Sequence, residues 1–256
     1  TKFDTQSVDE SETVPSNPKQ LIFARYLKEE LEKEGLKEVE MDEKGYIYAT
    51  LPANTDKSVP TIGFIAHYDT ALDASGANIK ARIVKGYDGG DIELSPGIVS
   101  SPKMFPELLA HKGEDLIVTD GTTLLGADDK TGCTILVTLI ETILNDKKLK
   151  HGDLHFVFSQ NEDIGRAAER FEEEYVDGQP DIVIDVDGDA PTAFSVENFT
   201  AVGRNYTFQG KNAHPGNGFY NQYGDALTAA SYFIGQLPPE THPCLLYTYP
   251  SPRDLS

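Results

Sequence analysis

Two adjacent acids stand where a turn enters an apolar segment. Asp128 and Asp129 lie between Gly126 and Gly132, and the apolar run begins at Cys133. The flanking glycines let the chain bend sharply and let its backbone pass close to a small ligand. Two carboxylates at the entrance to a core repel each other unless a cation lies between them. The alternative is that one Asp caps a buried helix, a position that Asp favours.

Acids and one histidine recur at three other places, each time just after an apolar run. They are His67 and Asp69, Glu162 and Asp163, and Asp187. In open α/β sheets, ligands bind beyond the carboxyl ends of the strands. Histidine and carboxylate ligands without cysteine suit zinc, or manganese or cobalt, in a catalytic rather than a structural role. The sequence therefore predicts a catalytic metal site at that end of the sheet.

The spacing of these residues indicates different roles for them. His67 and Asp69 face the same way on an extended segment, so His67 is expected to bind metal while Asp69 fixes its tautomer. Neighbouring acids point in different directions, so each adjacent pair is expected to divide its duties. Asp128 suits a carboxylate that bridges two metals. Glu162, beside a ligand, is placed to act as general base toward water.

Strand-like and helix-like segments alternate along the chain, which predicts an α/β layer architecture with a largely parallel sheet. Residues 71–113 hold several Gly and Pro residues and little periodicity, and are expected to form a long excursion from that sheet. Residues 1–17 are polar and are expected to form a loop or arm. The expected helices are 18–34, 133–144 and 166–175, and the expected strands are two within 39–51, then 61–66, 116–119, 153–159 and 181–186.

Composition narrows the classes of function. A chain of 256 residues with 39% apolar residues can bury the core of one large or two modest domains. Lysine and arginine number 22 against 42 acids, and the net charge of −20 argues against nucleic acid and anionic membranes as partners. No run of 18 apolar residues predicts a membrane span. Two cysteines without framework spacing favour a reducing compartment, and hence a cytoplasmic protein.

Four motifs together resemble one known family, the peptidase T tripeptide aminopeptidases. This group is part of the di-zinc exopeptidases, which also include glutamate carboxypeptidases and deacylases. The similarity extends from about Asp4 to Leu237 and includes stretches without catalytic duty. The segment Asp-Gly-Thr-Thr-Leu-Leu-Gly-Ala-Asp-Asp-Lys, residues 120–130, is very specific. The motifs are His67-Tyr68-Asp69-Thr70, residues 119–132, Val186-Asp187-Gly188 and His214-Pro215-Gly216.

The resemblance implies a role for each candidate residue. His67 and Asp187 correspond to ligands of one zinc, and Asp128 corresponds to the bridge between two zinc ions. Glu162 corresponds to the general base and Asp163 to a ligand of the second zinc. The resemblance also implies that Asp69 supports the site beside His67, and that the peptide bond between Asp128 and Asp129 is cis. His214 corresponds to a lid residue that helps to bind substrate or to stabilise the tetrahedral intermediate.

One motif departs from the family pattern. Around the base the family usually reads Pro-Asp-Glu-Glu, whereas this chain reads Gln160-Asn161-Glu162-Asp163. The base is kept, but the ligand is one methylene shorter, about 1.5 Å of reach. A carboxylate still coordinates metal, so Asp163 stays a predicted ligand.

The same resemblance implies a domain organisation. Residues 1–200 are expected to form the catalytic domain, a mostly parallel mixed sheet flanked by helices. Residues 201–242 are expected to begin a smaller α+β lid domain, with a strand at 201–210 and a helix at 219–233. Residues 243–256 resemble the translation of a sequencing adaptor, the alternative being a natural disordered terminus.

The resemblance ends at about His242, whereas family members continue past this point. A late histidine that ligates the second zinc would therefore lie outside the chain. The full-length parent is expected to hold two Zn²⁺ ions. This chain is expected to bind at most one tightly and to be inactive.

The implied function is a metallo-aminopeptidase that releases the N-terminal residue from tripeptides through a metal-activated water. A homodimer formed through the lid domain is the expected assembly of the parent. One alternative is a related di-zinc exopeptidase or deacylase of other specificity. Another is a metal-binding fragment without catalysis.

Overall fold

The computed structural model describes residues 2–168, 180–188, 193–196, 205–212, 214–216 and 224–237. The chain divides into two compact units, Thr1–Ala193 and Phe194–Ser256, and each unit is described by itself. The expected tail at 243–256 and most of the expected helix at 166–175 lie outside the described residues. Within the described ranges, no helix is both long and apolar enough to cross a membrane.

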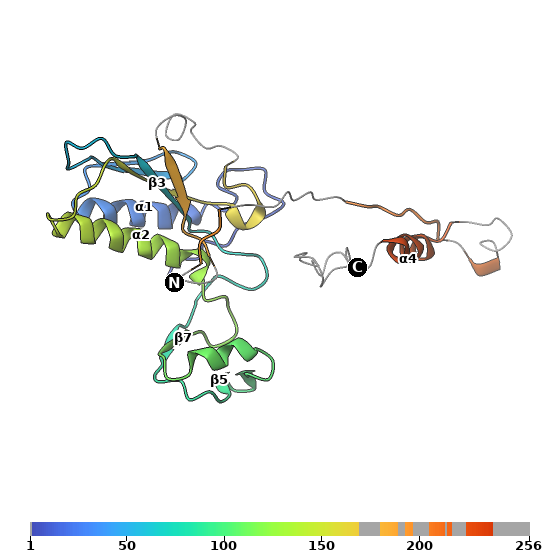
Figure 1. Ribbon diagram of the computed structural model, residues 1–256. Helices are drawn as coiled ribbons and strands as arrows, with labels where there is room; N and C mark the ends of the chain where they lie inside the picture. Colours follow the sequence, from blue (N-terminus) through green and yellow to red (C-terminus); the bar gives the residue numbers. More distant parts are fainter. Residues whose placement is uncertain are drawn as a thin grey trace. The chain divides into compact units, whose positions relative to one another are not determined.

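A five-stranded mixed sheet forms the centre of the first unit, with strand order β1-β2-β8-β3-β9 (Figure 1). The strands β8, β3 and β9 run parallel to one another, and the β1–β2 hairpin extends the sheet in antiparallel fashion. The short strand β3 lies between β8 and β9, and its almost wholly apolar sequence suits a strand that is covered on both faces. The bounds are β1 Glu38–Met41, β2 Ile47–Leu51, β3 Ile62–His67, β8 Leu154–Ser159 and β9 Ile182–Asp185.

Two helices, α1 (Gln20–Lys33) and α2 (Ala127–Asn145), contribute to the main core on one face of this sheet (Figure 1). In both helices the apolar residues recur at helical spacing and form a single buried stripe. The strands contribute alternate residues to the same core, because successive side chains point to opposite faces. The core includes Phe23, Ala24, Leu27 and Leu31 of α1, Cys133, Leu136 and Ile140 of α2, and Ala49, Ala66, Phe156 and Phe158 of the strands.

The opposite face of the sheet carries a second, smaller cluster. Tyr46, Tyr48 and Val157 are buried there, and the Tyr46 hydroxyl donates to the carbonyl of Ala167 at 2.7 Å. This bond ties the sheet to the segment just after the predicted base Glu162. Of the helix expected at 166–175, only residues 166–168 are described, and they are not helical.

The excursion between β3 and α2 contains more regular structure than its sequence predicted. It holds two separate two-stranded sheets, β4–β7 and β5–β6, and a 3₁₀ helix, η1 (Figure 1, green). The expected strand at 116–119 exists as β7, but it pairs with β4 and not with the main sheet. The bounds are β4 Arg82–Val84, β5 Ile92–Ser95, β6 Ile98–Ser100, η1 Pro106–His111 and β7 Leu116–Val118.

The second unit contains one described helix, α4 (Ala226–Gln236). Asp225 caps it, because its carboxylate accepts the backbone N–H of Leu227 at 3.0 Å. The helix expected at 219–233 is described only from residue 224 onward, because residues 217–223 are not described. Within that part it begins at Ala226. The strand expected at 201–210 is not found in the described residues 205–210, which are irregular.

Candidate functional site

His67, the last residue of β3, is the buried centre of an acidic cluster whose outer members, Asp128 and Glu162, are exposed to solvent. Its side chain is only 2% exposed. The Nδ1 atom lies 3.2 Å from Asp69 Oδ1. The Nε2 atom faces three other acids, at 3.0 Å from Asp128 Oδ1, 3.5 Å from Asp187 Oδ2 and 3.6 Å from Glu162 Oε2. One imidazole therefore separates one supporting carboxylate from three that gather on its other side.

Asp128 and Asp129 enter the site from the first turn of α2, not from the end of a main-sheet strand. Gly126 precedes them with a φ of +72°, and neither acid has helical backbone angles. The Asp128–Asp129 peptide bond is cis, as the resemblance implied. The two acids divide their duties as expected. Asp128 faces the ring of His67, whereas Asp129 accepts the backbone N–H groups of His67 at 3.2 Å and Gly132 at 2.9 Å.

Glu162 and Asp163 lie in the 3₁₀ helix η2 (Glu162–Ile164), which is separated from the end of β8 by two residues. Asp69 holds this turn, because its Oδ1 accepts the Glu162 N–H at 3.1 Å and its Oδ2 accepts the Asp163 N–H at 3.2 Å. Asn161 begins the turn with a φ of +62°, a conformation that Asn tolerates better than most residues. Asp69 therefore connects His67 to the predicted base and the predicted second ligand.

The donor atoms fit a divalent cation. Among the described residues, two groups of three side chains can each converge on one ion, with all ligand atoms within 4.8 Å of one another. The Oδ2 atom of Asp163 is buried without a hydrogen-bond partner in the described part of the chain. A buried carboxylate oxygen normally has a partner, and a metal ion would supply it. The groups are His67, Asp128 and Asp187, and His67, Asp69 and Asp163.

The pKa values of the residues around His67 also favour a bound cation. Burial raises the pKa of Asp163 to about 7, and the charge of Asp69 adds to the effect. Burial likewise raises the pKa of Glu162. For His67, burial acts to lower the pKa, but the hydrogen bond and charge of Asp69 outweigh it and raise the pKa to about 10. Burial therefore disfavours the charged forms of Glu162 and Asp163, a cost that a bound cation would offset.

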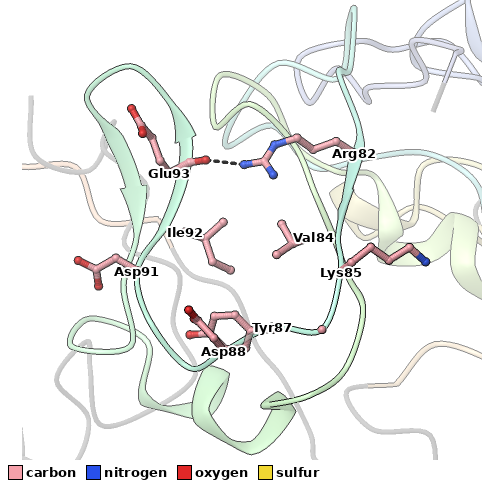
Figure 2. Close-up of a pocket in the computed structure, with 9 residues that line it drawn as sticks. Arg82, Val84, Lys85, Tyr87, Asp88, Asp91, Ile92 and Glu93 are labelled. Atoms are coloured by element: carbon pink, nitrogen blue, oxygen red, sulfur yellow. Dashed lines mark hydrogen bonds between the residues drawn. The ribbon is translucent and has the colours of Figure 1, made fainter.

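A cavity of about 320 Å³ lies in the excursion, between β4 and β5 (Figure 2). Its charged side chains have both signs, and the guanidinium of Arg82 donates to the backbone carbonyl of Glu93. No histidine lines this cavity, and no set of metal-ligating side chains converges in it among the described residues. The cluster around His67 is therefore the better candidate for chemistry.

His214 belongs to the second unit and is exposed there. Its Nδ1 accepts the backbone N–H of Gly216 at 3.3 Å. Its predicted role in binding substrate stays a prediction, because the two units are described separately.

In amino-acid sequence, the chain is similar to peptidase T proteins and to one family model. The chain is 45% identical over 239 residues to peptidase T of Clostridium botulinum (strain Loch Maree / Type A3), covering 93% of this chain and 58% of that protein. It is also 45% identical over 244 residues to peptidase T of Bacillus mycoides (strain KBAB4), covering 94% of this chain and 59% of the relative. The family model of M42 glutamyl aminopeptidases matches residues 117–216. The chain thus spans less than two thirds of these peptidase T relatives.

Solved structures share the fold. The aminopeptidase PepT from Bacillus cereus ATCC 10987 superposes with a TM-score of 0.54 at 24% identity, over 93% of this chain and 54% of that chain. A tripeptidase from Staphylococcus aureus superposes with a TM-score of 0.57 at 20% identity, over 92% of this chain and 53% of that chain. The α/β architecture expected from the sequence is therefore confirmed.

Two features of the site are absent from the sequence predictions. Asp129 orders the backbone around His67, and only its place beside Asp128 hinted at a role. Ser7, in the polar arm, donates to Asp69 Oδ2 at 2.6 Å. The arm carries no apolar period that would have shown it to be buried.

Proposed function

We propose that this chain belongs to the peptidase T family and forms part of a metallo-aminopeptidase that releases the N-terminal residue from tripeptides. The observation that carries the proposal is the convergence of Asp128, Glu162 and Asp187 on His67 Nε2, at 3.0 to 3.6 Å. Such a cluster is costly unless a cation or protons compensate its charge. The 45% identity to named peptidase T proteins supplies the reaction class.

The proposed ligands divide into two sets around a shared carboxylate. His67, Asp187 and Asp128 would hold one Zn²⁺, and Asp128 and Asp163 would contribute to a second. Zinc, when bound, supplies Lewis acidity that polarises the scissile carbonyl and makes water more acidic. Asp69 hydrogen-bonds Nδ1 of His67 and so leaves Nε2 directed at the ligand side.

Glu162 is proposed as the general base and acid. Its carboxylate is half exposed, so water and a peptide reach it, and it lies beside the ligands without belonging to either group of converging donors. It takes a proton from water as the water oxygen attacks the carbonyl carbon of the first peptide bond. It then delivers that proton to the amide nitrogen as the C–N bond breaks. One amino acid and one dipeptide are the products.

The remaining assignments belong to the same proposal. Residues 1–200 are proposed as the catalytic domain, residues 201–242 as the start of a lid that contributes His214 and a dimer contact, and residues 243–256 as an unrelated tail. The complete protein is proposed to be cytoplasmic, which the scarcity of cysteine supports. Small peptides are the proposed substrates.

A related exopeptidase or deacylase with another substrate is the second candidate. The similarity to M42 glutamyl aminopeptidases over residues 117–216 favours it, because that range includes Asp128, Glu162, Asp163 and Asp187. The same cluster would then act on a different amide bond.

The test has two arms. Metal-free chain is titrated with zinc, and we expect a single ion to bind tightly, with loss of that binding in the His67→Ala variant. His151→Ala is the matched control, because His151 lies away from the cluster and bonds only to the carbonyl of Gly152 among the contacts described for its ring. The complete protein that carries this chain is then given di-, tri- and tetrapeptides. Preferred release of the N-terminal residue from tripeptides supports the proposal. Absence of zinc binding in the titration, or cleavage of acylated amino acids and of no peptide, would refute it.

A further inference from the structure

The polar arm at the start of the chain packs along the segment that follows β3. Gln6 and Thr70 form a parallel bridge, in which Ser7 N–H donates to the Thr70 carbonyl at 3.0 Å and Thr70 N–H donates to the Thr5 carbonyl at 3.3 Å. The Thr5 hydroxyl donates to the carbonyl of Tyr68 at 2.8 Å. Thr5 and Ser7 are buried, with exposures of 0% and 1%. The arm is therefore part of the folded first unit.

Ser7 donates its hydroxyl proton to Asp69, and Gln20 fixes that direction. The Nε2 atom of Gln20 donates to the Thr5 carbonyl at 3.1 Å and to Ser7 Oγ at 3.0 Å. A carbonyl oxygen only accepts, so the amide nitrogen of Gln20 must face the arm. Ser7 Oγ accepts from Gln20 and its own proton is left for Asp69 Oδ2, at 2.6 Å.

Asp69 then has two donors on each oxygen. His67 Nδ1 and the Glu162 N–H lie on Oδ1, and the Ser7 hydroxyl and the Asp163 N–H lie on Oδ2. Of these four, only Ser7 comes from outside the predicted site. The four hydrogen bonds together fix the rotation of the carboxylate. Without the Ser7 hydroxyl, Oδ2 would keep only the long hydrogen bond from the Asp163 N–H, at 3.2 Å. The orientation of Asp69 therefore depends on the arm.

We propose that Ser7, oriented by Gln20, is a positioning residue for the cation site. It acts through Asp69, which in turn holds both the ring of His67 and the turn that carries Glu162 and Asp163. The inference rests on the proposed function, since it assumes that this cluster binds a divalent cation.

The experiment compares the zinc affinity of metal-free chains by competition with a chromogenic chelator. Changes to residues that orient metal ligands typically weaken binding 10- to 100-fold, so we expect Ser7→Ala to weaken it about tenfold. Ser7→Thr restores the hydroxyl and is expected to stay within about threefold of the wild type. Ser11→Ala is the matched control, because Ser11 is on the same arm but its exposed hydroxyl meets only Thr13 among its described contacts.

The midpoint of urea unfolding without metal is measured in parallel. A purely structural role would lower that midpoint in Ser7→Ala but leave the zinc affinity of the folded chains unchanged, and this result overturns the inference. The inference is also overturned if the zinc affinity of Ser7→Thr or of Ser11→Ala is as low as that of Ser7→Ala. Where Ser7→Ala does not fold, Gln20→Leu takes its place, with the same expected weakening and the same contrary result. A wild-type chain that binds no zinc refutes the proposed function itself, and the inference with it.

Discussion

His67 uses its two ring nitrogens for different contacts, and this asymmetry organises the site. Nδ1 meets Asp69, whose four donors fix it, whereas Nε2 meets the acids that would share a cation. The sequence predicted that these residues lie together, because each follows an apolar run and the ends of parallel strands meet at one edge of a sheet. It also assigned Asp128 as the bridging carboxylate, but it did not predict that Asp129 accepts backbone N–H groups of His67 and Gly132, because those contacts depend on a turn whose geometry no periodicity encodes.

The raised pKa values predict how the metal-free chain responds to pH. Asp129 and Asp163 have pKa values raised from 3.8 to about 7, mainly by burial. The folded state then binds more protons than the unfolded state, so the free energy of unfolding falls as pH rises from 3.8 through about 7. His67 has a pKa raised from 6.5 to about 10, so its contribution is complete below 6.5 and is lost as pH rises through about 10.

We therefore expect the urea midpoint in chelator to fall steadily from about pH 5 to about pH 9. Added zinc should reverse the trend, because a cation binds the deprotonated ligands. Asp163→Asn serves as the control, since it removes one titrating group and should flatten the profile near pH 7. A midpoint in chelator that stays level or rises over this range would contradict the assignment of these groups.

At the scale of elements, α2 brings Asp128 and Asp129 to the sheet. The sequence predicted α1 from its apolar spacing and α2 from an apolar run at 133–144, and α2 begins six residues before that run. The buried face of α1 was less predictable. Ile22, Tyr26, Leu27 and Leu31 recur at helical spacing, and this spacing predicts that one face of the helix is buried. Leu27 and Leu31 are buried, but Ile22 and Tyr26 are 54% and 43% exposed. Phe23 and Ala24 fill the core in their place. The excursion was not predictable either, because β4 and β7 are three residues each and pair across 30 or more residues of chain.

Gly132 is needed where α2 passes β9. A Cβ atom there would clash with the Val186 carbonyl and with the carboxylate of Asp129. Backbone cannot move aside cheaply, so Gly132→Ala should lower the free energy of unfolding by about 1–3 kcal/mol. It should also weaken zinc binding, since Asp187 follows Val186. Gly235→Ala in α4 meets open space and should be neutral or stabilising by up to about 1 kcal/mol. Equal effects of the two changes in urea unfolding would argue against this close approach.

The buried stripe of α2 can be tested with two isoleucines on the same helix. Ile140 is fully buried, whereas Ile135 is 50% exposed. Ile140→Ala should cost about 2–5 kcal/mol of the free energy of unfolding, because it removes core contacts and leaves a cavity. Ile135→Ala should cost roughly 1 kcal/mol or less. Chemical denaturation of both variants checks the difference, and a larger loss for Ile135→Ala would mean that α2 is rotated about its axis.

For the whole molecule, the first unit carries every described member of the acidic cluster, from His67 to Asp187. The sequence predicted this grouping, since four segments end in acids and three of them lie on or beside the parallel strands. His214, in the second unit, remains a prediction, because spacing along the chain does not determine how two units close on each other. The reaction therefore has to be tested in the complete protein.

The most direct measurement is the turnover of a tripeptide by the complete protein with Glu162 replaced by Gln. Glutamine keeps the size of the side chain but cannot accept a proton. We expect the zinc content to be unchanged while kcat falls by about 10²–10⁴-fold. A kcat within tenfold of the wild type would show that Glu162 is not the general base. Loss of zinc from the variant would show that Glu162 holds the metal, which contradicts its assignment as a residue beside the ligands.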